Sequence, residues 1–174
     1  MLHIKLFPAE YGDCIILSIG KESQYNILID GGLSKTYHKY IKAEIQHIKE
    51  LGQKIGLMVC THMDNDHICG LIQVLKGTNF NFIENVWYNG FLQIVNSRFY
   101  SQKENIFTEK DNKILDEIIF QGMLLDVDQE VGINEGMSLG VLIEERRIPL
   151  NSAARGQAIC SELVKNKYEI APSI

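Results

Sequence analysis

Two imidazoles and two carboxylates fall within six consecutive positions of the chain, at His62, Asp64, Asp66 and His67. Nitrogen and oxygen ligands of this kind suit zinc, manganese and iron, which are cations of intermediate hardness. The other interpretation is a turn whose carboxylates accept hydrogen bonds from nearby backbone amides, with Asp66 as the helix cap and both histidines incidental. Because the histidines flank the aspartates directly after an apolar strand, we favour metal binding.

The elements around this cluster can be predicted from hydrophobic patterns. A continuously apolar segment, Ile55–Cys60, predicts a buried strand, and a helix is expected to run from the end of the cluster through Leu75. The polar residues then occupy the loop between strand and helix. Ligands collect at this edge of open α/β sheets because the loops there are held by the sheet yet open to solvent.

Three shorter apolar segments precede this strand, at residues 2–7, 14–19 and 26–29. They are separated by Gly, Pro or polar turns and predict successive strands of one sheet. The second and third are too continuously apolar for a strand with one wet face, so we expect a cover on both faces of the sheet. One cover is predicted over residues 34–51, where apolar side chains recur at helical spacing, and Gly52 suits its C-terminal cap.

The pattern weakens beyond Gly77. A strand is predicted over residues 83–88, a helix over 111–125, a short strand over 138–143 and a helix over 153–166. The chain has no internal repeat and no low-complexity linker, and 45% of its residues are hydrophobic. We therefore expect residues 1–174 to form a single domain.

Composition excludes several classes of protein. The net charge is −5 and no block of five or six like charges occurs, so nonspecific binding of nucleic acid or of an anionic membrane is not expected. The four cysteines form no C-x-x-C pair and lie in apolar runs, which indicates reduced core thiols and a cytoplasmic protein. The N-terminus lacks the pattern of a signal peptide and no run of about 18 apolar residues occurs, so no membrane span is expected.

The cluster belongs to a recognisable set of motifs. HMDNDH at residues 62–67 resembles the H-x-H-x-D-H signature of the metallo-β-lactamase superfamily, with Asp64 in place of the second histidine. Together with GDCIIL at residues 12–17 and LIDGG at residues 28–32, it is similar to the soluble hydrolase domain of the bacterial competence DNA-uptake membrane protein, where GDAILI, LIDGG and THPDADH stand in the same order. The matching motifs cover residues 1–75.

This resemblance implies a fold and a set of roles. The fold would be α/β, a metallo-β-lactamase-like αββα sandwich with an incomplete second half and its metals at one edge. His62 and Asp64 would bind the first metal, and Asp66 and His67 the second. Asp30 would order the ligand loop rather than bind metal. Asp66 would also orient or deprotonate a water.

The resemblance also implies an activity. The chain would be a metal-dependent hydrolase that uses a metal-activated water on a phosphodiester or another ester-like bond, in a nucleotide, nucleic-acid or small-molecule substrate. The cofactor would be one or two divalent ions, with zinc preferred and manganese as the alternative. The carboxylate of Asp64 adds negative charge and hardness, which shifts the preference somewhat toward manganese.

The chain departs from the family after the first motif. No histidine follows His67, and no segment resembles the strand that carries the bridging aspartate. Asp126 and Asp128 are interpreted as solvated loop carboxylates. Either the chain stops before the second half-site or it is a short relative that binds one metal or none. The alternative function is thus a catalytically incompetent metal-binding or interaction module, whose uncovered sheet would be closed by a homodimer or another partner.

Several other residues have types or positions that could suit a functional site. Gly31 and Gly32 are predicted to form a turn near the metal loop rather than a phosphate-binding loop. Tyr88 and Asn89 are candidates for substrate contact, although core packing and a turn are favoured. Cys60 and Cys69 are predicted to pack in the core rather than to bind a soft metal. Surface or structural roles are expected for the remaining histidines and for three arginines, namely His3, His38, His47, Arg146, Arg147 and Arg155.

Overall fold

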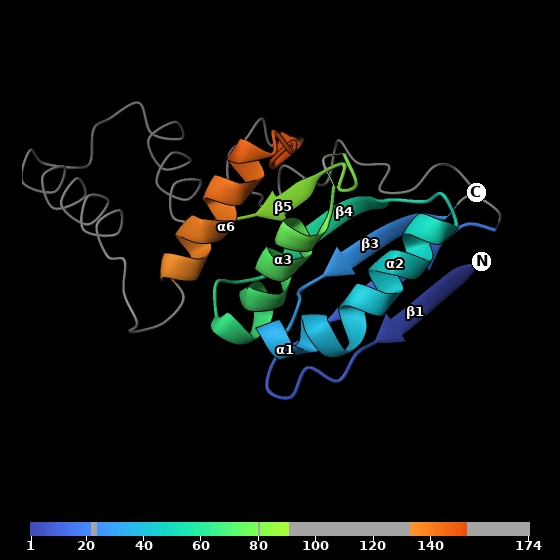
Figure 1. Cartoon of the computed structure of the whole chain (residues 1–174), viewed down its shortest axis with the longest axis horizontal. Coiled ribbons are helices and arrows are strands. Elements are labelled where there is room, and N and C mark those ends of the chain that lie inside the picture. Colours follow the sequence, from blue (N-terminus) through green and yellow to red (C-terminus); the bar gives the residue numbers. More distant parts are fainter. Residues whose placement is uncertain (22–23, 80, 91–132, 153–174) are drawn as a thin grey trace, which may run out of the picture.

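One five-stranded sheet with helices packed against one of its faces makes up the described part of the protein (Figure 1). The computed structural model describes residues 1–21, 24–79, 81–90 and 133–152. The α/β class expected from the sequence is therefore confirmed. The helices predicted over residues 111–125 and 153–166 lie outside the described residues. So do the candidates Asp126, Asp128 and Arg155, and the fourth cysteine, Cys160.

The strands stand in the order in which they occur along the chain, and each lies within or close to its predicted segment. They are β1 (Leu2–Leu6), β2 (Ile15–Ile19), β3 (Tyr25–Ile29), β4 (Ile55–Cys60) and β5 (Val86–Tyr88). The pairs β1–β2 and β2–β3 are antiparallel, whereas β3–β4 and β4–β5 are parallel. Parallel neighbours need a crossover, which the helices supply. The carboxyl ends of β3 and β4 therefore meet at one edge.

A continuous helical segment connects β3 to β4, as predicted over residues 34–51. It consists of α1 (Ser34–Thr36), the π-helical turn η1 (Tyr37–Ile41) and α2 (Lys42–Glu50). The backbone turns out of the helix at Gly52, which has a φ of +69° and whose amide donates to the carbonyl of Lys49. Glycine adopts this left-handed conformation without the penalty that other residues incur, so the predicted cap is confirmed.

Two further helices complete the described fold. Helix α3 (Asn65–Gly77) follows the ligand loop, and α6 (Ile133–Glu145) packs against α3. The strand predicted over residues 138–143 is wrong, because this segment lies inside α6. Its Leu139 and Ile143 are four residues apart and both are buried on the same helix face, whereas a short apolar run alone cannot distinguish helix from strand. Among the described helices, none combines the length and apolar character needed to cross a lipid bilayer.

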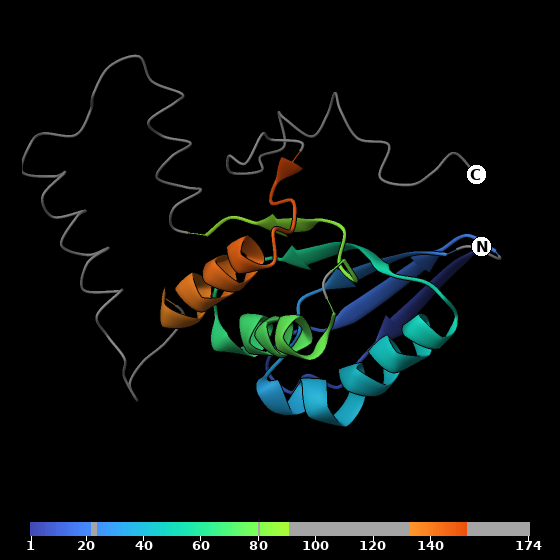
Figure 2. The same ribbon diagram turned by 45° about the horizontal axis from the view of Figure 1, so that its top comes forward.

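The core lies between the sheet and these helices (Figure 2). Side chains of the central strands, including Ile16, Leu28 and Met58, are fully buried there. Ile41 and Leu71 meet them from the helical segment and from α3. This close packing fixes the positions of β3 and β4, whose carboxyl ends carry the candidate site.

The opposite face of the sheet is also apolar, and the described helices do not cover it. The strand register aligns aliphatic and aromatic side chains on this face from one edge to the other. At the β1 edge, Leu2, Ile4 and Leu6 are 56%, 59% and 73% exposed. At its centre, Ile27 and Leu57 are only 5% exposed, so the exposure is concentrated at the β1 edge. We call this surface the open face; its members are Leu2, Ile4, Leu6, Ile15, Leu17, Ile19, Tyr25, Ile27, Ile29, Leu57, Val59 and Trp87.

Candidate metal centre

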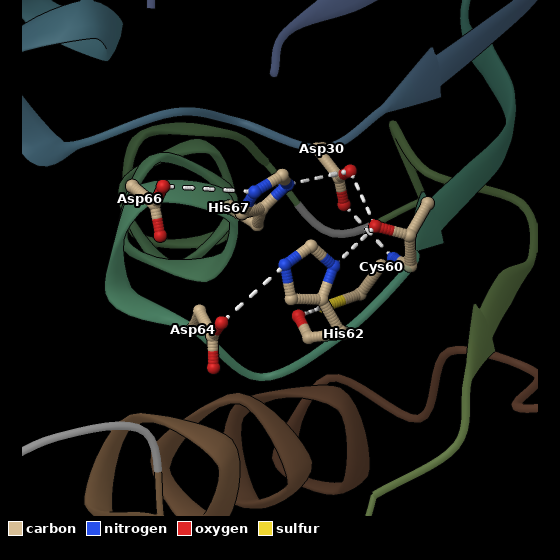
Figure 3. A network of polar contacts seen from close by, with 7 residues as sticks. Asp30, Cys60, His62, Asp64, Asp66 and His67 are labelled. Carbon is tan, nitrogen blue, oxygen red and sulfur yellow. Dashed lines mark hydrogen bonds and ion pairs between the residues drawn. The ribbon is translucent and has the colours of Figure 1, made fainter. Parts of the chain in front are cut away.

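The ligand cluster lies where β3 and β4 end, as the sequence predicts (Figure 3). Asp30 directly follows β3, and Thr61 and His62 directly follow β4. His67 lies in the first turn of α3, and its ring turns back toward Asp30. Asp30, which precedes Thr61 by 31 residues in the sequence, thus joins the side chains of the loop after β4 and of the first turn of α3 in one small volume.

Glycines at three positions allow these segments to approach so closely. A Cβ at Gly31 would overlap backbone atoms of α3, and a Cβ at Gly70 would overlap the carbonyl oxygen of Gly31. A Cβ at Gly12, in the β1–β2 loop, would overlap the backbone of Asp66. The Gly31 amide donates to the carbonyl of His67 at 2.8 Å. Gly12 of the GDCIIL motif and Gly31 of the LIDGG motif therefore allow close backbone packing against α3.

Asp30 joins the three segments through its carboxylate. The residue is 1% exposed and has a φ of +53°, which aspartate tolerates better than most residues. Its Oδ1 accepts from the Thr61 backbone amide at 2.8 Å, and its Oδ2 accepts from the Thr61 hydroxyl at 2.6 Å. The same Oδ2 lies 2.9 Å from Nδ1 of His67. Both carboxylate oxygens are therefore engaged by the protein.

The two histidines differ in exposure but stand ring against ring. Their centroids are 3.7 Å apart with the planes tilted by 48°. The side chain of His67 is 9% exposed, whereas that of His62 is 47% exposed. Nδ1 of His62 lies 2.8 Å from the hydroxyl of Thr61. Each ring thus has its Nδ1 held by the protein and its Nε2 directed elsewhere.

A carboxylate stands opposite each Nε2. Oδ2 of Asp64 is 3.6 Å from Nε2 of His62, and Oδ2 of Asp66 is 3.7 Å from Nε2 of His67. These separations are too long for hydrogen bonds. Two ligands of one tetrahedral ion, each about 2.1 Å from it, stand about 3.4 Å apart. The spacing therefore suits an ion shared by each pair.

The capping interpretation of the aspartates does not fit the structure. The N-cap of α3 is Asp64, whose side chain makes no capping hydrogen bond. Asp66 lies inside the first turn of the helix and is not the cap, contrary to the alternative considered from the sequence. Acidic groups at this helix end are favoured by the helix dipole without being bonded to it. Their oxygens remain directed toward the histidines.

A single ion could also be held by a different set of atoms. Ligand atoms of Asp30, His62 and His67 all lie within 4.8 Å of one another, and this is the one such group of His, Cys, Asp and Glu among the described residues. Asp30 is the weaker ligand of the three, because binding an ion would displace hydrogen bonds from Thr61 or His67. Its engaged oxygens suit the ordering of a ligand better than coordination.

The cysteines near the site belong to the core. Cys60 is buried, its thiol donates to the carbonyl of His62 at 3.1 Å, and burial together with the nearby charge of Asp30 raises its pKa to about 12. The same two causes raise the pKa of Cys14 to about 12. A thiol must lose its proton to bind a metal strongly, so both are poor ligands. Cys69 is half-buried and packs against the core.

Tyr88 is placed in the core rather than at a substrate surface. It is 3% exposed, and burial raises its pKa. The side-chain amide of Asn151 brackets its backbone, accepting from its N–H at 2.9 Å and donating to its C=O at 2.8 Å. The interpretation as a core and turn residue therefore fits the structure better than substrate contact. Asn89 beside it is exposed.

Thr61 is a member of the site for which the sequence predicted no role. Its hydroxyl contacts both Asp30 and His62, and its backbone amide contacts Asp30 as well. The available signal was its position, one residue before the first histidine and at the end of the strand that neighbours β3. That signal becomes readable only when the pairing of β3 with β4 is known.

The described histidines outside the cluster, His3, His38 and His47, are exposed and lie on β1 and the first helical segment. A scan against protein-family models found no matching family, and a search of curated proteins found no match. A function must therefore be inferred from the geometry of the cluster together with the resemblance of its motifs.

Proposed function

We propose that the chain is a metal-dependent hydrolase that binds one or two divalent ions, zinc or manganese, through His62, Asp64, Asp66 and His67. One observation carries the proposal: each histidine has its Nδ1 held by a protein partner while its Nε2 faces a carboxylate with no hydrogen bond between them. Metal-binding imidazoles are usually oriented in this way by a partner on their other nitrogen.

Each residue of the cluster would have a distinct role in hydrolysis. A bound divalent ion supplies Lewis acidity and makes water a nucleophile near neutral pH. Asp66 is 28% exposed in its side chain and is placed to orient that water and to accept a proton from it. Asp64, 69% exposed, stands at the solvent side, where it can adjust to the ion and to the substrate. Ester-like bonds are the proposed substrates, with phosphodiesters preferred because of the motif resemblance.

The proposed overall fold is the αββα sandwich of the resembled superfamily. A mixed sheet with helices on one face and an apolar surface on the other is what half of such a sandwich requires. A second sheet would cover the open face. The unpaired, buried thiols of Cys14 and Cys60 support the further proposal of a cytoplasmic location.

The metal content of the full chain tests the proposal. Protein purified without chelator should carry about one or two ions per chain, and the double variant Asp66→Ala, His67→Ala should lose them. The matched control is His47→Ala, Glu50→Ala, which removes an exposed imidazole and carboxylate from α2 and should keep the metal. A metal-free parent chain, even after reconstitution with zinc or manganese, would overturn the proposal. A metal-loaded chain would next be assayed for cleavage of a phosphodiester.

A second candidate is an interaction module that binds metal without catalysis. The open face favours it, because apolar residues on an edge strand exposed to this extent usually seek a partner. A second copy of the chain is the simplest partner. Concentration-dependent association that Ile4→Lys abolishes, in a metal-loaded protein without hydrolytic activity, would favour the module over the enzyme.

A further inference from the structure

A continuous chain of hydrogen bonds connects the two histidines through Thr61 and Asp30 (Figure 3). It runs from Nδ1 of His62 to the Thr61 hydroxyl at 2.8 Å, from that hydroxyl to Oδ2 of Asp30 at 2.6 Å, and from Oδ2 to Nδ1 of His67 at 2.9 Å. Asp30 is its centre, and both ends are imidazoles whose protonated nitrogen must be assigned.

Counting the protons assigns them. A carboxylate can only accept, so the hydroxyl of Thr61 and Nδ1 of His67 must both donate to Asp30. The hydroxyl has a single proton, and that proton is directed to Asp30. Its oxygen can therefore only accept from His62, whose Nδ1 must carry a proton. A neutral imidazole protonated at Nδ1 has its lone pair at Nε2.

We propose that Thr61 is a positioning residue that holds His62 in its Nδ1-protonated tautomer, so that His62 presents the lone pair of Nε2 as His67 does. Asp30 sets the tautomer of His67 directly and that of His62 through Thr61. One carboxylate thereby prepares both imidazoles as ligands. The consequence for metal binding rests on the proposed function, whereas the tautomers themselves are a property of the metal-free chain.

The backbone and the side chain of Thr61 have separable roles. The backbone amide donates to Oδ1 of Asp30 and fastens the ligand loop to the end of β3. The hydroxyl uses the other oxygen. Thr61→Val keeps the shape and the backbone bond but removes the hydroxyl, and Thr61→Ser returns the hydroxyl. A role limited to fastening the loop predicts little effect of valine on His62.

Nitrogen-15 spectra of histidine-labelled, metal-free full chain test the assignment. They would be recorded at increasing pH until the ring nitrogen signals no longer change, so that the tautomers of the neutral rings are compared. Long-range proton–nitrogen correlations should show His62 and His67 protonated at Nδ1. In Thr61→Val, His62 should become protonated mainly at Nε2 while His67 stays unchanged, and Thr61→Ser should restore the parent pattern. An Nε2-protonated His62 in the parent chain, or an unchanged His62 in Thr61→Val, would overturn the inference.

Metal affinity gives the second readout. Thr61→Val should weaken binding of zinc or manganese by roughly tenfold to a hundredfold, as loss of an outer partner of a ligand does, and Thr61→Ser should recover most of it. The control Thr78→Val removes a buried hydroxyl-bearing residue at the far end of α3 and should leave the affinity unchanged. Equal losses in the valine and serine variants would contradict the positioning role. Correct tautomers in a chain that binds no metal would support the inference but overturn the proposed function.

Discussion

The inner and the outer parts of the cluster are built differently. In the inner part, Asp30 and His67 are buried and are fixed by hydrogen bonds of 2.6–2.9 Å to each other and to Thr61. In the outer part, the side chains of His62 and Asp64 are 47% and 69% exposed and stand 3.6 Å apart. The inner geometry is thus set by the protein itself, whereas the outer carboxylate is free to adjust to an ion. Inner substitutions should affect folding as well as binding, and outer ones binding alone.

The largest effect is expected at Asp30. Asp30→Ala removes the acceptor of Thr61 and His67 and places alanine at a φ of +53°, so the free energy of unfolding should fall by about 3–4 kcal/mol. Asp30→Asn tolerates that backbone and keeps one oxygen, so its loss should be about half as large. Urea unfolding of metal-free protein measures both. A loss below about 1 kcal/mol for alanine would show that the inner bonds contribute little.

The second effect concerns the backbone contact that supports the inner part. In Gly70→Ala the new Cβ would overlap the carbonyl oxygen of Gly31, so we expect a loss of about 2–3 kcal/mol and weaker metal binding. Gly140→Ala in α6 is the matched control, because a Cβ there meets no atom within 4 Å. Alanine favours helix over glycine by about 0.5–1 kcal/mol, so this control should be slightly stabilised. Equal unfolding curves for the two variants would contradict the close approach.

Both parts of the site share one limit on what could be predicted from the sequence. The four residues of the HMDNDH motif and their place at the end of β4 followed from local composition and an apolar strand. The hydroxyl of Thr61 did not, because its partners come from another strand end and from its neighbour. Which side chain bonds Asp30 depends on the pairing of β3 with β4, and local patterns do not contain that pairing.

The same limit on prediction from local patterns applies to the fold. Strands β1 to β4 and the first helical segment were predicted nearly residue for residue, because the strands are short apolar runs bounded by Gly, Pro or polar turns and the helix has apolar side chains at helical spacing. Residues 138–143 were predicted as a strand, because a short apolar run fits either period and the partner that decides it is α3. Among the described residues, helices cover one face of the sheet, whereas a cover was expected on both. The composition of a strand shows that a face is apolar, but it does not identify what packs on that face.

A smaller effect on stability is expected in the outer part. Asp64→Ala should leave the free energy of unfolding of the metal-free chain within about 0.5 kcal/mol of the parent, because its side chain makes no capping hydrogen bond and is mostly exposed. Metal affinity should nevertheless fall by about tenfold or more, since an ion would lose a charged ligand. Unfolding in urea and metal titration on the same samples separate the two. A destabilisation as large as that of Asp30→Asn would remove the distinction between inner and outer parts.

The smallest expected effect is the reactivity of Cys60, which reports whether the inner part stays closed. Its ordinary thiol pKa of 9.0 is raised to about 12, so at pH 8 it should react with a maleimide far more slowly than the half-buried Cys69. Between pH 9 and about 12 the unfolded chain loses the thiol proton while the folded chain keeps it, so the free energy of unfolding should fall as the pH rises through this range.

The labelling of Cys60 also distinguishes the two parts of the site. Asp64→Ala should not change the labelling rate of Cys60. Asp30→Asn should raise it, because the loop after β4 then lacks part of its attachment to β3. Mass spectrometry of the labelled peptides measures each site, and equal acceleration in both variants would mean that the thiol responds to the whole loop rather than to its inner attachment.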